Sequence, residues 1–322
     1  MSDTPQAGPA ASESQTLTTE KVAPPPSGGR RRKKEEKPAS LWTDAWHDLR
    51  RRPMFIFALA LIAILLIMSF WPSLFTSINP LDARSCDLAT ARQGPSAGHI
   101  FGRDNLGCDV YARTIYGASN SILIGVSTTV ITGIVGGLLG LLAGARGGVT
   151  DTVTSRVTEV FFAIPQILGA LLITATFRDK GLGIWIVVIA LSVLAWPMTF
   201  RIMRAAVITA RSQDFVVAAR ALGASQRRVM FGHLLPNAIA PVIVVATINL
   251  GGFIAAEAAL SFLGVGVQSP DISWGLMIAD ARSRFLEAPL PLVFPAVFLS
   301  ITVLAFIMMG DAVRDALDPK LR

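Results

Sequence analysis

The chain has 322 residues, of which 52% are hydrophobic and 16% charged, and its mean hydropathy is +0.54. A soluble domain is nearer a quarter charged, so this composition argues against an ordinary soluble enzyme and favours a membrane protein with several spans. The pI of about 10.0 would suit a nucleic-acid-binding protein, but a membrane protein with basic residues in its cytoplasmic segments has a high pI as well.

The first segment, residues 1–40, is rich in Ser, Thr, Pro, Gly and charged residues, and it carries a basic run from Arg30 to Lys34. Such a segment cannot bury enough apolar surface to fold, so we expect a disordered cytoplasmic tail. The basic run could bind anionic lipid or could be a solvated segment that reinforces the topology, and we favour the second interpretation.

Residues 41–113 are expected to hold an amphipathic approach, a first transmembrane anchor and an extracytoplasmic loop. Trp42 and Trp46 suit the membrane interface, and three arginines precede the apolar run 54–71. At about 1.5 Å per residue this run reaches about 27 Å, which is enough to cross a membrane. A cleaved signal peptide is the alternative, but the preceding tail is too long and no small-residue cleavage site follows.

The remaining apolar runs predict an all-α integral membrane protein with six transmembrane helices. We expect a five-helix core over residues 114–311, a cytoplasmic loop at 204–237 and a cytoplasmic C-terminal tail at 312–322. The five core spans are predicted at 119–145, 160–177, 184–203, 238–260 and 292–309. An even number of crossings places both termini on the same side.

The distribution of the basic residues predicts on which side of the membrane the termini lie. With the N-terminus inside, 21 of the 29 Lys and Arg residues are cytoplasmic and eight are outside. This asymmetry fits the positive-inside rule. The basic pI then needs no nucleic acid to explain it.

Small residues in the second span indicate close helix packing, because glycines spaced four apart let two backbones approach. These glycines are Gly133, Gly136, Gly137, Gly140 and Gly144. Pro165 and Pro197 should kink the third and fourth spans, which is tolerated around a cavity or a pathway.

Two acidic residues lie in or beside the spans. Glu159 is at the cytoplasmic mouth of the third span, where we expect an interfacial role. Glu257 is near the outer end of the fifth span, and it could equally line the pathway or pair with another helix. Glu257 and Pro197 are therefore the candidates for pathway residues.

The stretch 214–237 is a long polar segment between two spans. Asp214 can cap a short helix on which Phe215, Ala218, Ala219 and Leu222 share a face, and Gly223 suits a left-handed stop. A second helix should start at Ser225, and Pro236 should mark the bend into the next span. Helices this short need a surface to dock on.

Several kinds of chemistry are absent from the sequence. There is no P-loop, no G-x-S-x-G, no H-E-x-x-H and no buried ladder of acids and histidines for a proton relay. The three histidines lie far apart and have no Cys partner at metal-ligand spacing. We therefore expect no catalytic residues, no metal site and no cofactor on this chain, so any ATP would be bound by partner subunits.

The stretch 214–237 resembles the EAA loop of ABC importer permease subunits, which reads E-A-A-x-x-x-G followed by a distant L-P. Val217 replaces the glutamate, and Leu235 and Pro236 supply the distant pair. The alternative is an amphipathic helix pair lying on the membrane. Residues 99–118, 258–274 and 310–322 narrow the resemblance to the peptide/nickel permease group, over nearly all of the chain from residue 42 onward.

This resemblance implies a type I importer permease that pairs with a second permease subunit. Cytoplasmic ATPase subunits would bind its loop, and an extracytoplasmic binding protein would deliver the substrate to the bacterial inner membrane. The residues expected to contact the ATPase are Val217, Ala218, Ala219, Arg220, Ala221, Gly223, Arg227, Arg228, Leu235 and Pro236. We expect a dipeptide or oligopeptide substrate, with nickel as the near alternative and an ATP-independent channel or carrier as the distant one.

Cys108 stands where the family usually has arginine, and Cys86 lies 22 residues before it on the same outer loop. In an oxidising setting we expect the two cysteines to pair, with two free or buried thiols as the alternative.

Overall fold

The computed structural model describes residues 46–317, and over that range the regular structure is helical, with two isolated β-bridges in the outer loop. The disordered tail expected at residues 1–40 lies outside the described residues. Five helices are long and apolar enough to cross a membrane, which confirms the all-α membrane class. They are α2 (Pro53–Phe70), α3 (Val110–Arg146), α6 (Trp185–Arg211), α10 (Ala240–Phe262) and α12 (Leu290–Leu317).

The third expected span is broken. Helices α4 (Gly148–Phe162) and α5 (Gln166–Phe177) meet at an angle of 81°, and the short 3₁₀ turn η4 (Arg178–Lys180) follows. Pro165 has no N–H to donate and disfavours the helical conformation of the residue before it. The expectation of one kinked helix over 160–177 is therefore wrong, although the bent pair counted as one span restores six.

Several helices extend beyond the apolar runs that predicted them. The Asp109 carboxylate accepts a hydrogen bond of 2.6 Å from the Ala112 N–H, so α3 begins at Val110 rather than at 119. Helix α6 continues to Arg211 and α12 to Leu317, so the start of the 204–237 loop and of the 312–322 tail is helical. The length of an apolar run predicts which part of a helix crosses the lipid. The residues at which the helix begins and ends depend on capping and on packing.

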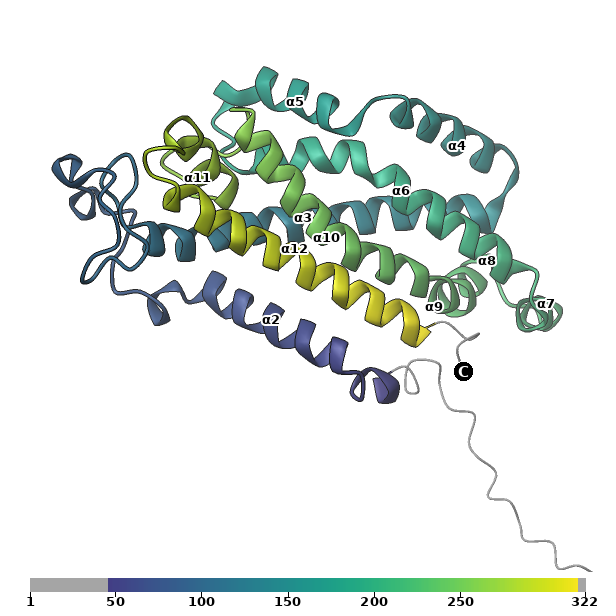
Figure 1. The fold of residues 1–322 in the computed structure, drawn as a ribbon. Helices are drawn as coiled ribbons and strands as arrows, with labels where there is room; N and C mark the ends of the chain where they lie inside the picture. The colour runs from purple at the N-terminus through teal and green to yellow at the C-terminus, as the bar shows by residue number, and fades with distance from the viewer. Residues whose placement is uncertain (1–45, 318–322) are drawn as a thin grey trace, which may run out of the picture. The chain divides into compact units, whose positions relative to one another are not determined.

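Two groups of short elements lie at opposite ends of the bundle (Figure 1). One end holds the outer loop with its 3₁₀ turns and helix α11 (Trp274–Ala281), and the other holds α7, α8 and α9. The turns of the outer end are η1 (Pro72–Leu74), η2 (Ala83–Ser85), η3 (Leu88–Thr90) and η6 (Arg282–Arg284).

Helices α3 and α6 pack with their backbones close together along one row of glycines. A Cβ added to Gly136 would lie 2.5 Å from the Trp196 carbonyl oxygen, and one at Gly140 would lie 2.6 Å from that of Phe200. Gly144 is similarly enclosed, whereas Gly133 meets nothing within 4 Å and Gly137 only a Met203 methyl at 3.9 Å. The row spaced four apart from Gly136 therefore forms the helix contact that the sequence predicted, and Gly133 lies outside it.

The beginning of α2 and the end of α12 are joined. Arg52 forms an ion pair of 3.0 Å with Asp315, and Phe55 packs in a small apolar cluster with Ala312 and Ala316. The first and last described spans therefore have adjacent ends at the α7–α9 end of the bundle (Figure 1).

Candidate functional site

The polar stretch between α6 and α10 folds as a chain of short helices. Helix α7 (Asp214–Ala221) is followed by α8 (Gln226–Val229), a π-helical turn η5 (Met230–Leu234) and α9 (Leu235–Ala238). Together they form a helix-turn-helix at one end of the bundle (Figure 1).

The turn after α7 has the hydrogen bonds that close a helix through a left-handed residue. The Gly223 N–H donates to the Arg220 carbonyl at 2.9 Å, and the Ala224 N–H donates to the Ala219 carbonyl at 3.0 Å. Gly223 has φ +81°, which agrees with the expected left-handed stop. The Ser225 hydroxyl accepts a hydrogen bond from the Arg228 N–H and so caps the start of α8. The expected cap at Asp214 is wrong, because the helix already includes that residue.

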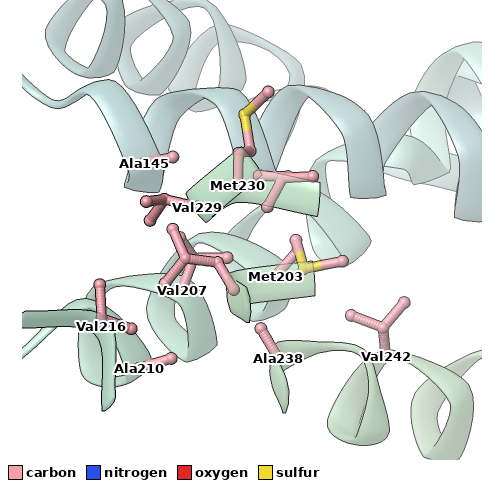
Figure 2. Close-up of a cluster of buried hydrophobic side chains, with 11 residues drawn as sticks. Ala145, Met203, Val207, Ala210, Val216, Val229, Met230, Ala238 and Val242 are labelled. Carbon is pink, nitrogen blue, oxygen red and sulfur yellow. The ribbon is translucent and has the colours of Figure 1, made fainter. Parts of the chain in front are cut away.

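One face of this helix-turn-helix is anchored in the bundle. Val216 of α7 is fully buried, and Val229, Met230 and Leu234 join it in a single apolar cluster with the ends of α3, α6 and α10 (Figure 2). The partners from those three helices include Ala145, Met203, Val207, Ala210 and Val242. The two short helices are thus held by tertiary packing, which replaces the stability that their length cannot give.

Three large apolar side chains of this segment are exposed. Leu222 is 89% exposed, Val217 is 58% and Phe231 is 50%. Of the residues expected to contact the ATPase, eight are exposed and two, Ala219 and Leu235, are half-buried. The exposed ones are Val217, Ala218, Arg220, Ala221, Gly223, Arg227, Arg228 and Pro236. The structure therefore presents the expected set on one connected segment, with arginines beside an uncovered apolar surface.

A cavity of about 770 Å³ opens between α4 and α6. The Arg201 guanidinium lies in its lining, 4.9 Å from the ring centre of Phe162, and Glu159 lies on it as well. The Glu159 carboxylate is exposed and pairs with Arg156 at 2.7 Å, and the interfacial role expected for it stays a prediction. Beside the cavity Arg204 holds Asp151 through two hydrogen bonds, one of 2.7 Å, and so ties the start of α4 to α6.

Two smaller cavities continue this hollow along the break between α4 and α5. One of about 300 Å³ shares Phe162 and Met198 with the large cavity. The next, of about 380 Å³, shares Gln166, Asn249 and Phe253 with the second. We call this continuous surface the groove, and it extends from Arg201 to the outer half of α10. Neither Gln166 nor Asn249 was singled out from the sequence, although Asn249 is an amide side chain in the middle of an apolar run.

The two pathway candidates named from the sequence do not face the groove. Pro197 is a buried residue of α6, and Glu257 is completely buried. The Glu257 carboxylate accepts hydrogen bonds from Ser261 at 2.7 Å, Ser273 at 2.8 Å and Ser121 at 3.3 Å. Glu257 thus joins α10 to α3 and to the start of α11, which supports the alternative that it pairs with other helices.

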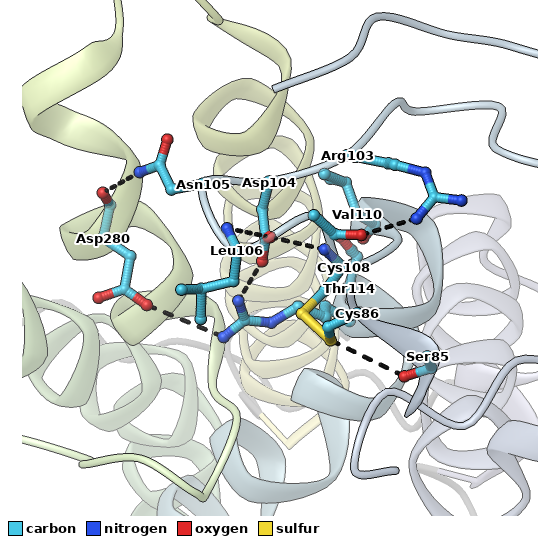
Figure 3. A network of polar contacts seen from close by, with 12 residues as sticks. Ser85, Cys86, Arg103, Asp104, Asn105, Leu106, Cys108, Val110, Thr114 and Asp280 are labelled. Atoms are coloured by element: carbon cyan, nitrogen blue, oxygen red, sulfur yellow. Dashed lines mark hydrogen bonds and ion pairs between the residues drawn. A yellow bond between two sulfur atoms is a disulfide. The ribbon is translucent and has the colours of Figure 1, made fainter. Parts of the chain in front are cut away.

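The outer loop is crosslinked and closely tied to α3. Cys86 and Cys108 form a disulfide, with an S–S distance of 2.00 Å (Figure 3). The buried Arg113 guanidinium hydrogen-bonds the Asp104 carboxylate and lies 3.8 Å from that of Asp280 on α11. Partial burial raises the pKa of the Asp280 carboxyl above its ordinary value, Arg113 opposes the rise and Asp104 adds to it. This end of the molecule is therefore a charged, covalently fixed surface.

Within residues 46–317 no group of three or more His, Cys, Asp or Glu side chains could hold a metal ion. The expectation that the chain has no metal site or cofactor remains a prediction.

The chain is similar to two family models. Residues 136–322 match the binding-protein-dependent transport system inner membrane component, and residues 40–95 match the N-terminal transmembrane domain of oligopeptide transport permease C. A solved structure of the MetNI methionine ABC transporter aligns with TM-score 0.53 and 22% identity, over 63% of this chain and 96% of that one. This structural likeness supports the type I permease fold.

Among curated proteins, the Oligopeptide transport system permease protein OppC of Bacillus subtilis is 36% identical, over 89% of this chain and 92% of the relative. The Glutathione transport system permease protein GsiD of Salmonella typhimurium is 38% identical, over 87% of this chain and 91% of the relative. The Dipeptide transport system permease protein DppC of Alkalihalophilus pseudofirmus is 36% identical, over 88% of this chain and 91% of the relative. These matches cover most of both chains in each case.

Proposed function

The chain belongs to the family of binding-protein-dependent transport system inner membrane components, and we propose that it forms half of the membrane pathway of an ATP-driven peptide importer. As a member of this family it is a multi-pass inner-membrane permease subunit, a non-catalytic part of an ABC importer that works with an ATPase and a substrate-binding protein. The proposal adds the substrate class, a second and different permease subunit, and the residues that couple ATP hydrolysis to transport.

The exposed face of the α7–α9 segment carries this proposal. Its inner face is fixed by the cluster around Val216, while Val217, Leu222 and Phe231 are left uncovered beside Arg220 and Arg227. Exposed apolar side chains with arginines near them in the chain are typical of a contact with another protein, and arginines offer charge-assisted hydrogen bonds to it. We infer that the ATPase docks here and that the segment transmits its closure to α6 and α10 as a rigid body.

The orientation follows from the charge distribution. Placing the α7–α9 end in the cytoplasm puts most Lys and Arg residues inside, as the positive-inside rule requires. The neighbouring ends of α2 and α12, joined by Arg52 and Asp315, lie at that same end and support cytoplasmic termini. The crosslinked loop around Cys86 and Cys108 would then face the oxidising side, where the binding protein arrives.

The proposed substrate class comes from the relatives. Their names specify oligopeptides, dipeptides and glutathione, which share peptide bonds and differ in length and side chains. We propose that ATP is bound and hydrolysed by the partner subunits, because this chain has no P-loop.

Uptake measurements test the proposal. Cells with and without the subunit are given labelled dipeptides, longer peptides and nickel, with and without depletion of ATP. We expect the subunit to be required for uptake of a peptide and ATP to be required as well. Peptide uptake that survives ATP depletion would favour a channel or carrier, and loss of nickel uptake alone would reassign the substrate.

A further inference from the structure

The middle of the groove has two polar side chains that the structure leaves without partners. Gln166 is the first residue of α5, directly after the break at Pro165, and Asn249 lies near the middle of α10. Both line the two smaller cavities of the groove. The break between α4 and α5 and the middle of α10 thus bring two amides to the same surface of the groove.

Neither amide makes a hydrogen bond to another described residue. The other four asparagines in residues 46–317 all do. Asn79 accepts from the Leu81 N–H, and Asn105, Asn120 and Asn237 donate to backbone carbonyls. An amide left in hydrocarbon without a partner is costly. A groove that water or substrate enters would remove this cost.

The rest of this part of the groove is uncharged. Alanine, glycine, proline, leucine, isoleucine, methionine and phenylalanine complete the lining of the two smaller cavities. Such a lining gives no fixed charge with which to select a substrate side chain. The only hydrogen-bonding side chains that it presents are the two amides.

An amide side chain carries both a donor and an acceptor, as does every residue of a peptide main chain. Pairing between them does not depend on the side chains of the peptide, which suits a pathway for peptides of varied sequence. We propose that Gln166 and Asn249 form a binding site in the pathway, at which their side-chain amides hydrogen-bond the main chain of the transported peptide. This inference rests on the proposed function and names the substrate group that the groove recognises.

The test uses the complete transporter in proteoliposomes at saturating loaded binding protein, so that capture by the binding protein does not limit the rate. Two substrates are compared: a labelled tripeptide, and the same tripeptide methylated on its central amide nitrogen. Gln166→Leu and Asn249→Leu remove the hydrogen-bonding groups at similar size. Ser300→Leu is the matched control, because Ser300 is an exposed hydroxyl on α12 that bonds only to its own helix, at the Ala296 carbonyl.

We expect the double variant to transport the unmodified tripeptide about tenfold more slowly, since it lacks two hydrogen-bonding groups. The wild-type transporter should prefer the unmodified tripeptide to the methylated one, and the double variant should lose most of that preference. The Ser300→Leu variant should keep both the rate and the preference.

Equal slowing for both substrates would overturn the proposal, as would unchanged transport in the double variant. Loss of the second permease subunit from the purified double variant would show that the amides hold that subunit, and this too would overturn it. A wild-type transporter that moves no peptide at all would refute the proposed function instead, so the two failures are distinguishable.

Discussion

Glu257 gives the sharpest prediction about what holds the outer half of the bundle together. Its carboxylate is the shared acceptor for hydroxyls from α3, from its own helix and from the residue before α11. Each of the three serine oxygens also accepts a backbone N–H, at Trp274, Val267 and Leu276. Since a hydroxyl has one hydrogen to donate, all three hydrogens go to the carboxylate.

The Glu257→Ala variant would leave three buried hydroxyls without an acceptor and a cavity where the side chain was. At about 1 kcal/mol for each hydrogen bond lost, plus the cavity, the cost is about 3 to 5 kcal/mol. The Glu257→Gln variant keeps the shape and one carbonyl oxygen, which can still accept from Ser261 and Ser273. Only the longer bond to Ser121 is lost, so the cost is about 1 kcal/mol.

Thermal unfolding of the detergent-solubilised transporter measures the difference. At about 2 to 4 °C for each 1 kcal/mol, the alanine variant should lose at least about 6 °C in Tm and the glutamine variant no more than about 4 °C. Uptake should follow the same order, because Glu257 is completely buried and holds the start of α11 through Ser273. Equal losses in the two variants, or a stable alanine variant, would refute the reasoning.

Three further predictions concern packing, the outer crosslink and pH. Gly140→Leu should separate α3 from α6 and cost about 1 to 3 kcal/mol of stability, whereas Gly133→Leu, with open space around it, should leave Tm unchanged. Alkylation under non-reducing conditions, read by mass spectrometry, should label neither Cys86 nor Cys108, and full labelling of both would refute the disulfide. The folded-state pKa of Asp280 is raised, so the folded chain binds more protons there than the unfolded chain, and stability should fall as pH rises above the ordinary pKa of an aspartate, about 4. Asp280→Asn should flatten this fall in stability, and an unchanged Tm profile would contradict the reasoning.

The sequence predicted the features that depend on local chemistry. The left-handed Gly223, a second short helix beginning next to Ser225 and the small-residue contact of α3 all follow from a few neighbouring residues, and the structure has them. Apolar runs also located the spans. Helix ends were less predictable, because α3 and α12 continue through polar residues that capping and packing hold in place.

Features that depend on distant partners could not be read from the sequence. The role of Glu257 rests on Ser121 and Ser273, which lie 136 and 16 residues away. Gln166 and Asn249 come together because the chain breaks at Pro165, and a proline by itself predicts a kink as readily as a break. The α7–α9 segment, by contrast, could be recognised in the sequence, because the residues proposed to contact the ATPase lie on one continuous stretch.

The most direct test of the account is whether that segment couples an ATPase to transport. Gly223 has φ +81° with no atom within 4 Å of an added Cβ, so Gly223→Asp strains the backbone of the turn without a steric clash inside the chain, and its side chain should obstruct a docked partner. Gly148→Asp is the matched control, since Gly148 has φ +58° and equally open space at the start of α4.

Wild-type and Gly148→Asp preparations in mild detergent should retain an ATPase and support ATP-dependent peptide uptake. Gly223→Asp should reach the membrane at the same level, lose the ATPase and lose uptake. Full retention of the ATPase together with normal uptake in Gly223→Asp would contradict the account.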